Sequence, residues 1–186
     1  MNKPVSRSLE ILSPVNNGAI EWSAKLREDI VEGDPGSILR DEVPTFHGLS
    51  VSGNVTGKIV FAGKLNMYSK ICLPFSELIF PMHTGYGSKR DFEALEAKGF
   101  DLRKEPTIVL VKYGKVFRGL KVKAAQEAGA IGCLIYSDPG DDGEKTIKNG
   151  YKPYPEGPAR QPSSVQRGSV QFLSSYPGDP STPGCQ

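Results

Sequence analysis

The chain has 186 residues, of which 38% are hydrophobic and 24% are charged, and it holds 21 glycines and 15 prolines. This length suits one domain with a real core, and the Gly and Pro content predicts short strands joined by many loops. The formal net charge is +2 and no run of Lys or Arg forms a stripe, which argues against nucleic acid as a partner.

The sequence pattern of the N-terminal third predicts short strands and one short helix. The stretch "RSLEIL" (7–12) indicates a strand, and "WSAKLREDIV" (22–31) indicates a short helix that stops at "EGDPGS". Residues 43–63 alternate polar and apolar side chains between Gly and Asn, which predicts short antiparallel strands joined by turns. This region includes an N-glycosylation sequon at Asn54, which matters only if the chain enters the secretory route.

Residues 64–84, "KLNMYSKICLPFSELIFPMHT", do not resemble their surroundings. They are bulky and apolar without a clear period, so a buried strand pair or a hydrophobic loop is the simplest interpretation. The next segment, "SKRDFEALEAKGFDL", predicts a helix. Ser88 is a plausible N-cap with Asp91 three residues later, and Gly99 supplies a left-handed stop.

A strand, a helix and a second strand follow with short links. The β-branched run 107–114 predicts a strand covered on both faces, and residues 130–138 predict another. Between them, "GLKVKAAQEAGA" predicts a helix ended by Gly129. We expect Leu120, Ala124 and Ala128 on its buried face, and Lys121, Lys123 and Glu127 turned outward. Such a βαβ unit makes the two strands parallel.

After Asp138 the chain is rich in Pro and Gly, and only "SVQFLSS" (169–175) resembles a strand. So many turn residues predict an ordered covering loop, or a surface that another part completes.

Arg118 stands at the mouth of the second helix, where the positive end of the helix dipole disfavours a cation. Ligands gather at such strand ends, and the amides of Gly119 and Leu120 with a guanidinium would suit a carboxylate or phosphate. Residue chemistry alone favours a plainer alternative, an ion pair with an aspartate of the next loop. The candidates are Asp138, Asp141 and Asp142.

Other site chemistry has little support. His47 and His83 are the only histidines, and neither belongs to a zinc motif. There is no GxSxG serine motif, and "PGDDGE" lacks the alternating ligands of a calcium loop. The three cysteines fit neither a disulfide framework nor a CxxC site, and Cys133 lies in an apolar run that predicts burial. No complete catalytic constellation is present.

Four motifs carry a family resemblance: VFRG (116–119), YSDP (136–139), VQRG (165–168) and GDPSTPG (178–184). With them, the stretch from Val43 to Gly184 resembles the protease-associated (PA) domain of the M28B group. That group includes the glutamate carboxypeptidase-like proteins, the transferrin receptor and fungal vacuolar-sorting members. The sequence of the last hundred residues most resembles the fungal members.

The resemblance implies an α+β, β-rich fold, with a mixed sheet or open barrel and flanking helices. Residues 1–40 would be a lead-in segment and residues 41–186 the PA domain, with 64–84 as an atypical insert. We hypothesise that this insert is a retained intron or a lineage-specific loop, and that the ending "GCQ" reflects a truncated gene model. The zinc peptidase domain of the family lies mostly downstream and is absent from this sequence.

The resemblance also implies roles for three residues. Arg118 of VFRG would reach over the active site and grip the C-terminal carboxylate of a substrate. Ser169 stands where the family has an Asn that makes a second polar contact, so a preference for glutamate is in doubt. Thr182 would contribute to a structural calcium site, together with the backbone carbonyl at Cys185 and ligands from the missing domain.

We therefore expect a non-catalytic cap or interaction module with no cofactor of its own, whose intact parent would need zinc and calcium. Its partner would be the family's catalytic domain or a peptide or protein ligand, and a homodimer is a further expectation. The alternatives are one part of an active zinc carboxypeptidase and a free-standing adaptor. By resemblance the protein belongs to the secretory and vacuolar system, although the sequence shows neither a signal peptide nor a transmembrane segment.

Overall fold

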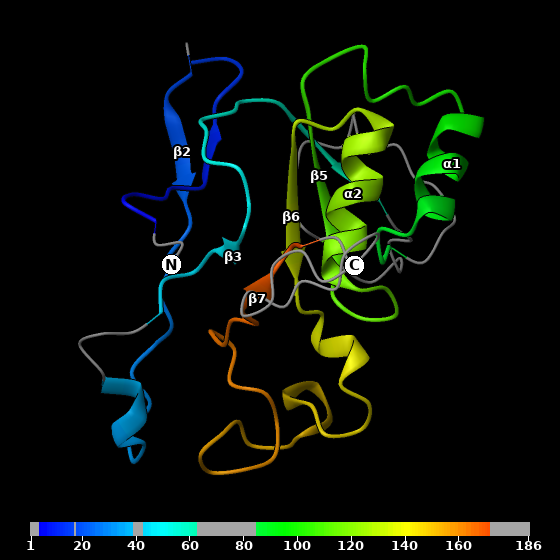
Figure 1. The fold of residues 1–186 in the computed structure, drawn as a ribbon. Helices are drawn as coiled ribbons and strands as arrows, with labels where there is room; N and C mark the ends of the chain where they lie inside the picture. The colour runs from blue at the N-terminus through cyan, green and yellow to red at the C-terminus, as the bar shows by residue number, and fades with distance from the viewer. Residues whose placement is uncertain (1–3, 17, 39–42, 63–84, 172–186) are drawn as a thin grey trace, which may run out of the picture. The chain divides into compact units, whose positions relative to one another are not determined.

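A computed structural model of the chain describes residues 4–16, 18–38, 43–62 and 85–171. The chain divides into two compact units. One unit joins residues 1–48 to residues 138–168, and the other joins residues 49–137 to residues 169–186. Figure 1 shows the course of the chain, and each unit is described by itself.

The second unit is built on a three-stranded parallel sheet in the order β4-β5-β6. Its strands are β4 (Lys58–Phe61), β5 (Thr107–Lys112) and β6 (Gly132–Tyr136). Val109 of β5 lies opposite Val60 of β4 and Cys133 of β6. The parallel β5–β6 pair confirms the βαβ prediction.

Two helices, α1 (Lys89–Ala97) and α2 (Arg118–Ala128), cover one face of this sheet (Figure 1). Along β5, Val109 and Val111 are fully buried, whereas the residues between them are half-buried. Because side chains alternate between the faces of a strand, the helices close only one of the two faces completely. The core on that face comprises Ala62, Phe92, Leu95, Leu102, Val109, Val111, Ala124 and Ala125.

Helix α1 begins and ends as the sequence predicts. The Ser88 hydroxyl accepts a hydrogen bond from the Asp91 amide at 3.2 Å, and the Asp91 carboxylate accepts one from the Ser88 amide at 2.8 Å. These reciprocal bonds form a capping box, with Asp in place of the usual Glu or Gln. Gly99 follows the C-cap with a φ of +88°, which confirms the predicted stop.

The first unit contains mostly short extended segments. Strands β1 (Glu10–Leu12) and β2 (Ile20–Ser23) form an antiparallel pair, and β3 (His47–Gly48) pairs with β7 (Gly168–Ser169), of which Gly168 belongs to this unit and Ser169 to the other. Single turns of 3-10 helix lie at Pro35–Ile38, Pro139–Asp141 and Ile147–Asn149.

Arg167 of the VQRG motif fastens the end of this unit's long loop to its N-terminal segment. Its Nη1 lies 2.9 Å from a Glu28 carboxylate oxygen, and its Nε donates to the Val43 carbonyl at 2.9 Å. The other Glu28 oxygen accepts from the Val165 amide at 2.6 Å. Residues far apart in sequence are therefore joined by a charged side chain that the sequence motif contains.

Two secondary-structure predictions are wrong. The predicted helix 22–31 is absent, because residues 20–23 pair with β1 and the Leu26 carbonyl accepts hydrogen bonds from Arg7 and Thr45. In 43–63, β4 pairs in parallel with β5 rather than forming an antiparallel hairpin. The chain reaches β5 by way of α1, and a crossover of this kind makes neighbouring strands parallel.

The α+β class is confirmed, and within the described residues no barrel closes. The unusual segment 64–84 lies outside the described residues, as do Thr182 and Cys185.

Candidate functional site

Arg118 is the first residue of α2, directly after the loop that leaves the carboxyl end of the central strand β5. The N-cap residue, Phe117, makes no side-chain capping bond, and the first turn contains no acidic residue. The first amides of an α-helix lack i−4 partners, but at this end of α2 the Leu120 amide already donates to the Phe117 carbonyl at 3.0 Å. Such a helix end favours an anionic ligand.

The Arg118 guanidinium packs on Tyr113, with its carbon 5.7 Å from the ring centroid. The Nε atom is buried and has no hydrogen-bond partner. Burial raises the pKa of Tyr113, and the neighbouring Arg118 cation opposes that rise. The aromatic face therefore holds the guanidinium in place while one of its donors remains unsatisfied.

Gly119 brings the segment after β7 against the first turn of α2. A Cβ atom on Gly119 would overlap the carbonyl oxygen of Gln171 and would come within 2.9 Å of the Phe117 ring. Val170, in the same segment, is buried. The glycine of VFRG is thus required by close backbone approach. The contact places Arg118 and the β7 residue Ser169 on chain segments that meet at one end of α2.

The structure corrects the predicted orientation of α2. Lys121 is fully buried, with 0% of its surface exposed, whereas Leu120 is 45% exposed. The Lys121 ammonium donates to the Tyr86 carbonyl at 2.5 Å and to the Gly114 carbonyl at 2.8 Å. The small residues Ala124 and Ala125 are also buried. Their spacing from Lys121 is i+3 and i+4, a pattern in the sequence that indicates one shared helix face.

Lysines also surround the ring of Tyr86, which sequence reasoning did not single out. The ammonium groups of Lys112, Lys115 and Lys121 lie 4.9, 4.8 and 5.7 Å from the ring centroid. A buried aromatic face can hold a cation by its quadrupole. The last residue of β5, the loop after it and α2 therefore contribute positive charge around the Tyr86 ring.

Two of the aspartates considered as partners for Arg118 have other partners. Asp142 pairs with Arg160 through two hydrogen bonds of 2.5 and 2.7 Å, and the Arg160 guanidinium lowers the pKa of Asp142. The Asp138 side chain accepts from the Gly140 amide at 2.9 Å and caps its own turn. Both bonds lie within the first unit of the chain.

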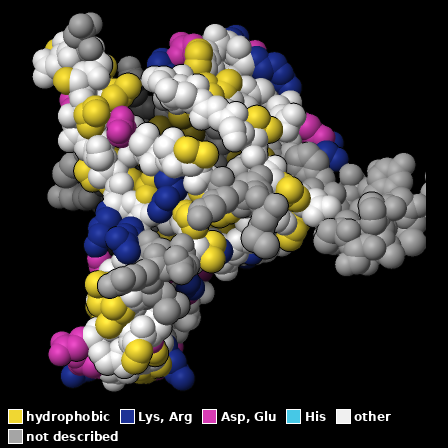
Figure 2. Space-filling model, turned by 60° about the vertical axis from the view of Figure 1, so that its left-hand side comes forward, with side chains coloured by type: hydrophobic (Ala, Val, Ile, Leu, Met, Phe, Trp, Pro, Cys, Tyr) yellow, Lys and Arg dark blue, Asp and Glu magenta, His cyan; other side chains and the backbone are white. Residues whose placement is uncertain are grey.

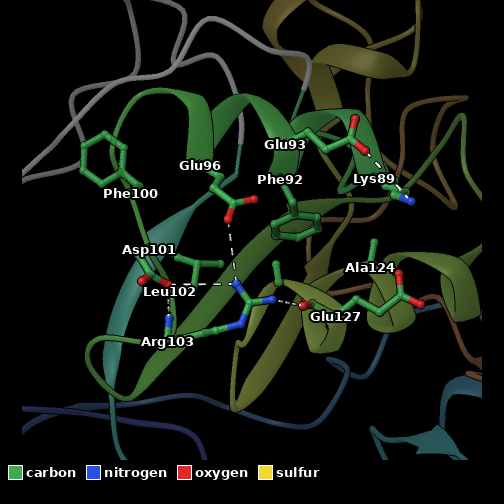
Figure 3. A pocket seen from close by; sticks show the side chains of 11 residues that line it. Lys89, Phe92, Glu93, Glu96, Phe100, Asp101, Leu102, Arg103, Ala124 and Glu127 are labelled. Carbon is green, nitrogen blue, oxygen red and sulfur yellow. Dashed lines mark hydrogen bonds and ion pairs between the residues drawn. The ribbon is translucent and has the colours of Figure 1, made fainter.

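A surface pocket of about 110 Å³ lies between α1, the following loop and α2 (Figure 3). Figure 3 shows the Arg103 guanidinium among its acidic neighbours. Arg103 donates to the Glu127 carbonyl at 2.5 Å and lies 4.0 Å from carboxylate oxygens of Glu96 and Asp101. These contacts join the two helices, so the pocket has a structural explanation. Arg118 does not line it.

The remaining predicted residues are placed as follows. His47 lies half-buried in β3, and His83 and Thr182 are outside the described residues. Cys133 packs against the core, where burial raises the pKa of its thiol to about 12, as its apolar surroundings predict. Among the described side chains, no group of three or more His, Cys, Asp or Glu could hold a metal ion. Within that part of the chain, no helix has the length and apolar character to cross a bilayer.

Comparison with known proteins agrees with these motifs. The sequence model of the PA domain matches residues 55–171. Over 98% of its length the chain is 46% identical to a probable glutamate carboxypeptidase of Arthroderma benhamiae, of which it covers 21%. Over 93% of its length it is 40% identical to vacuolar protein sorting-associated protein 70 of Saccharomyces cerevisiae, of which it covers 18%.

A probable glutamate carboxypeptidase of Arabidopsis thaliana is 33% identical over 97% of the chain, again with 21% of that relative covered. The chain thus spans about a fifth of the curated relatives that it matches. The domain match extends over most of the residues, including β4, β5, α2 and β6. On this evidence the chain belongs to the PA domain family.

Proposed function

We propose that this chain is the non-catalytic PA portion of a glutamate carboxypeptidase-like protein, in which Arg118 binds the C-terminal carboxylate of a peptide substrate. The observation that carries the proposal is Arg118 itself. It stands at the open start of α2, packed on Tyr113, with a buried Nε that has no partner. Arg118 as a whole is only half-buried, so a carboxylate could pair with its guanidinium and face the positive end of the helix dipole.

The environment of Arg118 supports a ligand with a single negative headgroup. Lys112 and Lys115 place positive charge over the Tyr86 ring, and both belong to the chain segment that leads into α2. Ser169 lies on the segment that passes the first turn of α2 and offers one hydroxyl for a second polar contact. A hydroxyl is shorter than an amide, so we infer that this chain discriminates weakly for glutamate over other C-terminal residues.

Zinc chemistry, under this proposal, comes from outside the described residues, among which no three-ligand cluster occurs. The names of two relatives, probable glutamate carboxypeptidases, favour a partner domain of that kind. The calcium site at Thr182 and a homodimer belong to the same proposal. Sequencing the native transcript through the codons for residues 60–90 and past Gln186 tests it first. A frame that continues into a zinc domain supports the cap, and a true end at Gln186 favours a free-standing adaptor.

A binding experiment tests Arg118 directly. In the ¹⁵N-arginine-labelled chain, N-acetylglycine should shift the Arg118 Nε–Hε resonance, and N-acetylglycinamide, which lacks the carboxylate, should not. Arg118→Gln should weaken N-acetylglycine binding by roughly 10- to 100-fold, because a hydrogen bond to a charged group contributes about 1.5–3 kcal/mol. Arg90→Gln, at an exposed position of α1, is the matched control. Equal binding of the acid and the amide would refute the carboxylate site.

A vacuolar or secretory location is part of the same proposal. One relative is named a vacuolar sorting-associated protein. Asn54 of the glycosylation sequon lies in an exposed stretch without regular structure, where a glycan has room. Passage through the secretory route should therefore leave an N-glycan on the native protein. A mass unchanged by N-glycosidase treatment would count against that route.

A further inference from the structure

We infer that Lys121 is a positioning residue for Arg118. Its buried side chain, on α2, binds the loop 113–117, and the position of that loop determines where the Arg118 guanidinium lies. The inference rests on the proposed carboxylate-binding role of Arg118 for its functional meaning, but its geometry can be measured without any ligand.

The Lys121 ammonium joins two turns that are otherwise separate in sequence. One is the segment 85–87 before α1, where Gly85 and Gly87 have φ values of +73° and +66°. The other is the start of the β5–α2 loop, where Gly114 has a φ of +102°. Lys121 donates to the carbonyl of Tyr86 in the first turn and to that of Gly114 in the second. The Lys121 side chain is wholly buried and its bond to the Tyr86 carbonyl lies away from water, whereas Gly114 is an exposed residue.

The two ends of the loop that carries Arg118 both meet Lys121. Its ammonium binds the carbonyl of Gly114 at the start of the loop, and its backbone amide donates to the carbonyl of Phe117 at the end of the loop, at 3.2 Å. The chain between Gly114 and Lys121 is therefore closed into a ring by one side chain, with Arg118 inside that ring. Lys115 has a positive φ of +55°, a conformation that a non-glycine residue adopts only when its surroundings impose it.

The groups facing the ammonium explain why a lysine can occupy a buried position. The Tyr86 ring lies 5.7 Å away and accepts the cation on its face. Asp91, from α1, is the acidic group whose charge favours the protonated form. Cys133, from β6, is the other titratable neighbour, and Lys112 and Lys115 approach the same ring. An apolar side chain here would remove one donor from each of these carbonyls, although the Gly114 carbonyl would still accept from the Val116 amide at 2.6 Å.

The test compares Lys121→Met with Lys123→Met in the full chain. Lys123 is on the same helix, and its ammonium lies 3.8 Å from a Glu127 carboxylate oxygen. The probe is the Arg118 Nε–Hε resonance in the ¹⁵N-labelled chain at pH 6.5, without ligand. Because Arg118 packs on Tyr113 and its Nε is buried, this proton should be ring-current shifted and slow to exchange. Tyr113→Leu identifies the ring contribution.

In Lys121→Met we expect loss of the ring-current shift and at least a tenfold faster exchange of the Arg118 Hε. Amide protection in β5 and β6 should stay unchanged, and Lys123→Met should resemble the wild type. A folded Lys121→Met protein whose Arg118 resonance is unchanged would overturn the inference, because a purely structural lysine would alter only global stability.

If Lys121→Met does not fold, a measurement on the wild type can still test the inference. In the wild type, the Lys121 Nζ protons and the Arg118 Hε should exchange with solvent through the same local opening of the structure, and should therefore give the same opening equilibrium constant. Clearly different opening equilibria would overturn the inference. Titration with N-acetylglycine distinguishes the positioning role of Lys121 from the proposed function of Arg118. If Lys121→Met alters the Arg118 resonance but Arg118 binds no carboxylate, the proposed function is refuted and the positioning role stands.

Discussion

At the scale of the residue, the buried ammonium of Lys121 is the least expected feature. Burial lowers the pKa of Lys121 to about 8, against an ordinary value of 10.5. The folded chain therefore releases this proton at a pH at which the unfolded chain still holds it. Because the unfolded state binds more protons between those two values, the free energy of unfolding must rise with pH in that window.

We predict that the wild type gains stability relative to Lys121→Met as pH rises from about 8 toward 10. The limiting slope is about 1.4 kcal/mol per pH unit, the free energy of one proton per unit of pH. About one pH unit or more below 8, the difference between the two proteins should be nearly constant. Urea unfolding at pH 7, 8, 9 and 10 measures it, and a difference that stays flat over the whole range would show that the pKa is not lowered.

At the scale of the element, α1 shows how local sequence can specify a helix. Ser88, Asp91 and Gly99 are recognisable from their spacing alone, and each makes the contact that its position predicts. Helix α2 differs, because its N-cap has no capping side chain and its buried face includes a lysine. Its start is instead held by packing against the segment at Gln171 and by the Lys121 bonds.

We expect Ser88→Ala to lower the free energy of unfolding by about 0.5–2 kcal/mol, the usual cost of losing an N-cap hydroxyl. The loss should fall at the upper end of that range, because Asp91, its partner in the capping box, is itself buried. Chemical denaturation measures the change, with Ser52→Ala at an exposed position as the control. A change no larger than the control's would mean that the capping box contributes nothing to stability in solution.

At the scale of the whole molecule, apolar side chains remain exposed at many places. Figure 2 shows several separate yellow regions on the face in view. In the β1–β2 pair, Ile20 and Trp22 are 58% and 51% exposed. A two-stranded pair of this kind has little stability of its own and gains from a cover. The chain spans only about a fifth of its relatives, which suits a surface that other parts of a longer protein would cover.

We therefore predict that the isolated chain self-associates at high concentration. Static light scattering should give a mass above the 20.2 kDa of one chain, rising with concentration. Trp22→Gln should lower that mass, whereas Glu21→Gln, at the neighbouring exposed position, should not. A constant mass of one chain at high concentration would contradict the prediction.

The sequence by itself determined the elements that depend on neighbouring residues. The capped helix α1, the βαβ unit with its parallel strands and the position of Arg118 at the start of α2 all follow from local spacing and from recognisable motifs. Cys133 in its apolar strand belongs to the same group. In each case a cap, a turn residue, a hydrophobic period or the order of neighbouring elements is enough to predict the feature.

Only the tertiary structure decided features whose partners are distant in the chain. The sequence of segment 22–31 predicts a helix, but its first residues pair with β1 and its Leu26 carbonyl accepts hydrogen bonds from Arg7 and Thr45. Strand β4 is parallel because a crossover separates it from β5. The sequence predicts that Lys121 is exposed, whereas in the fold its ammonium donates to the carbonyls of Tyr86 and Gly114. A buried polar group is stable only where its hydrogen-bond partners are, and those partners come from the fold rather than from the local pattern.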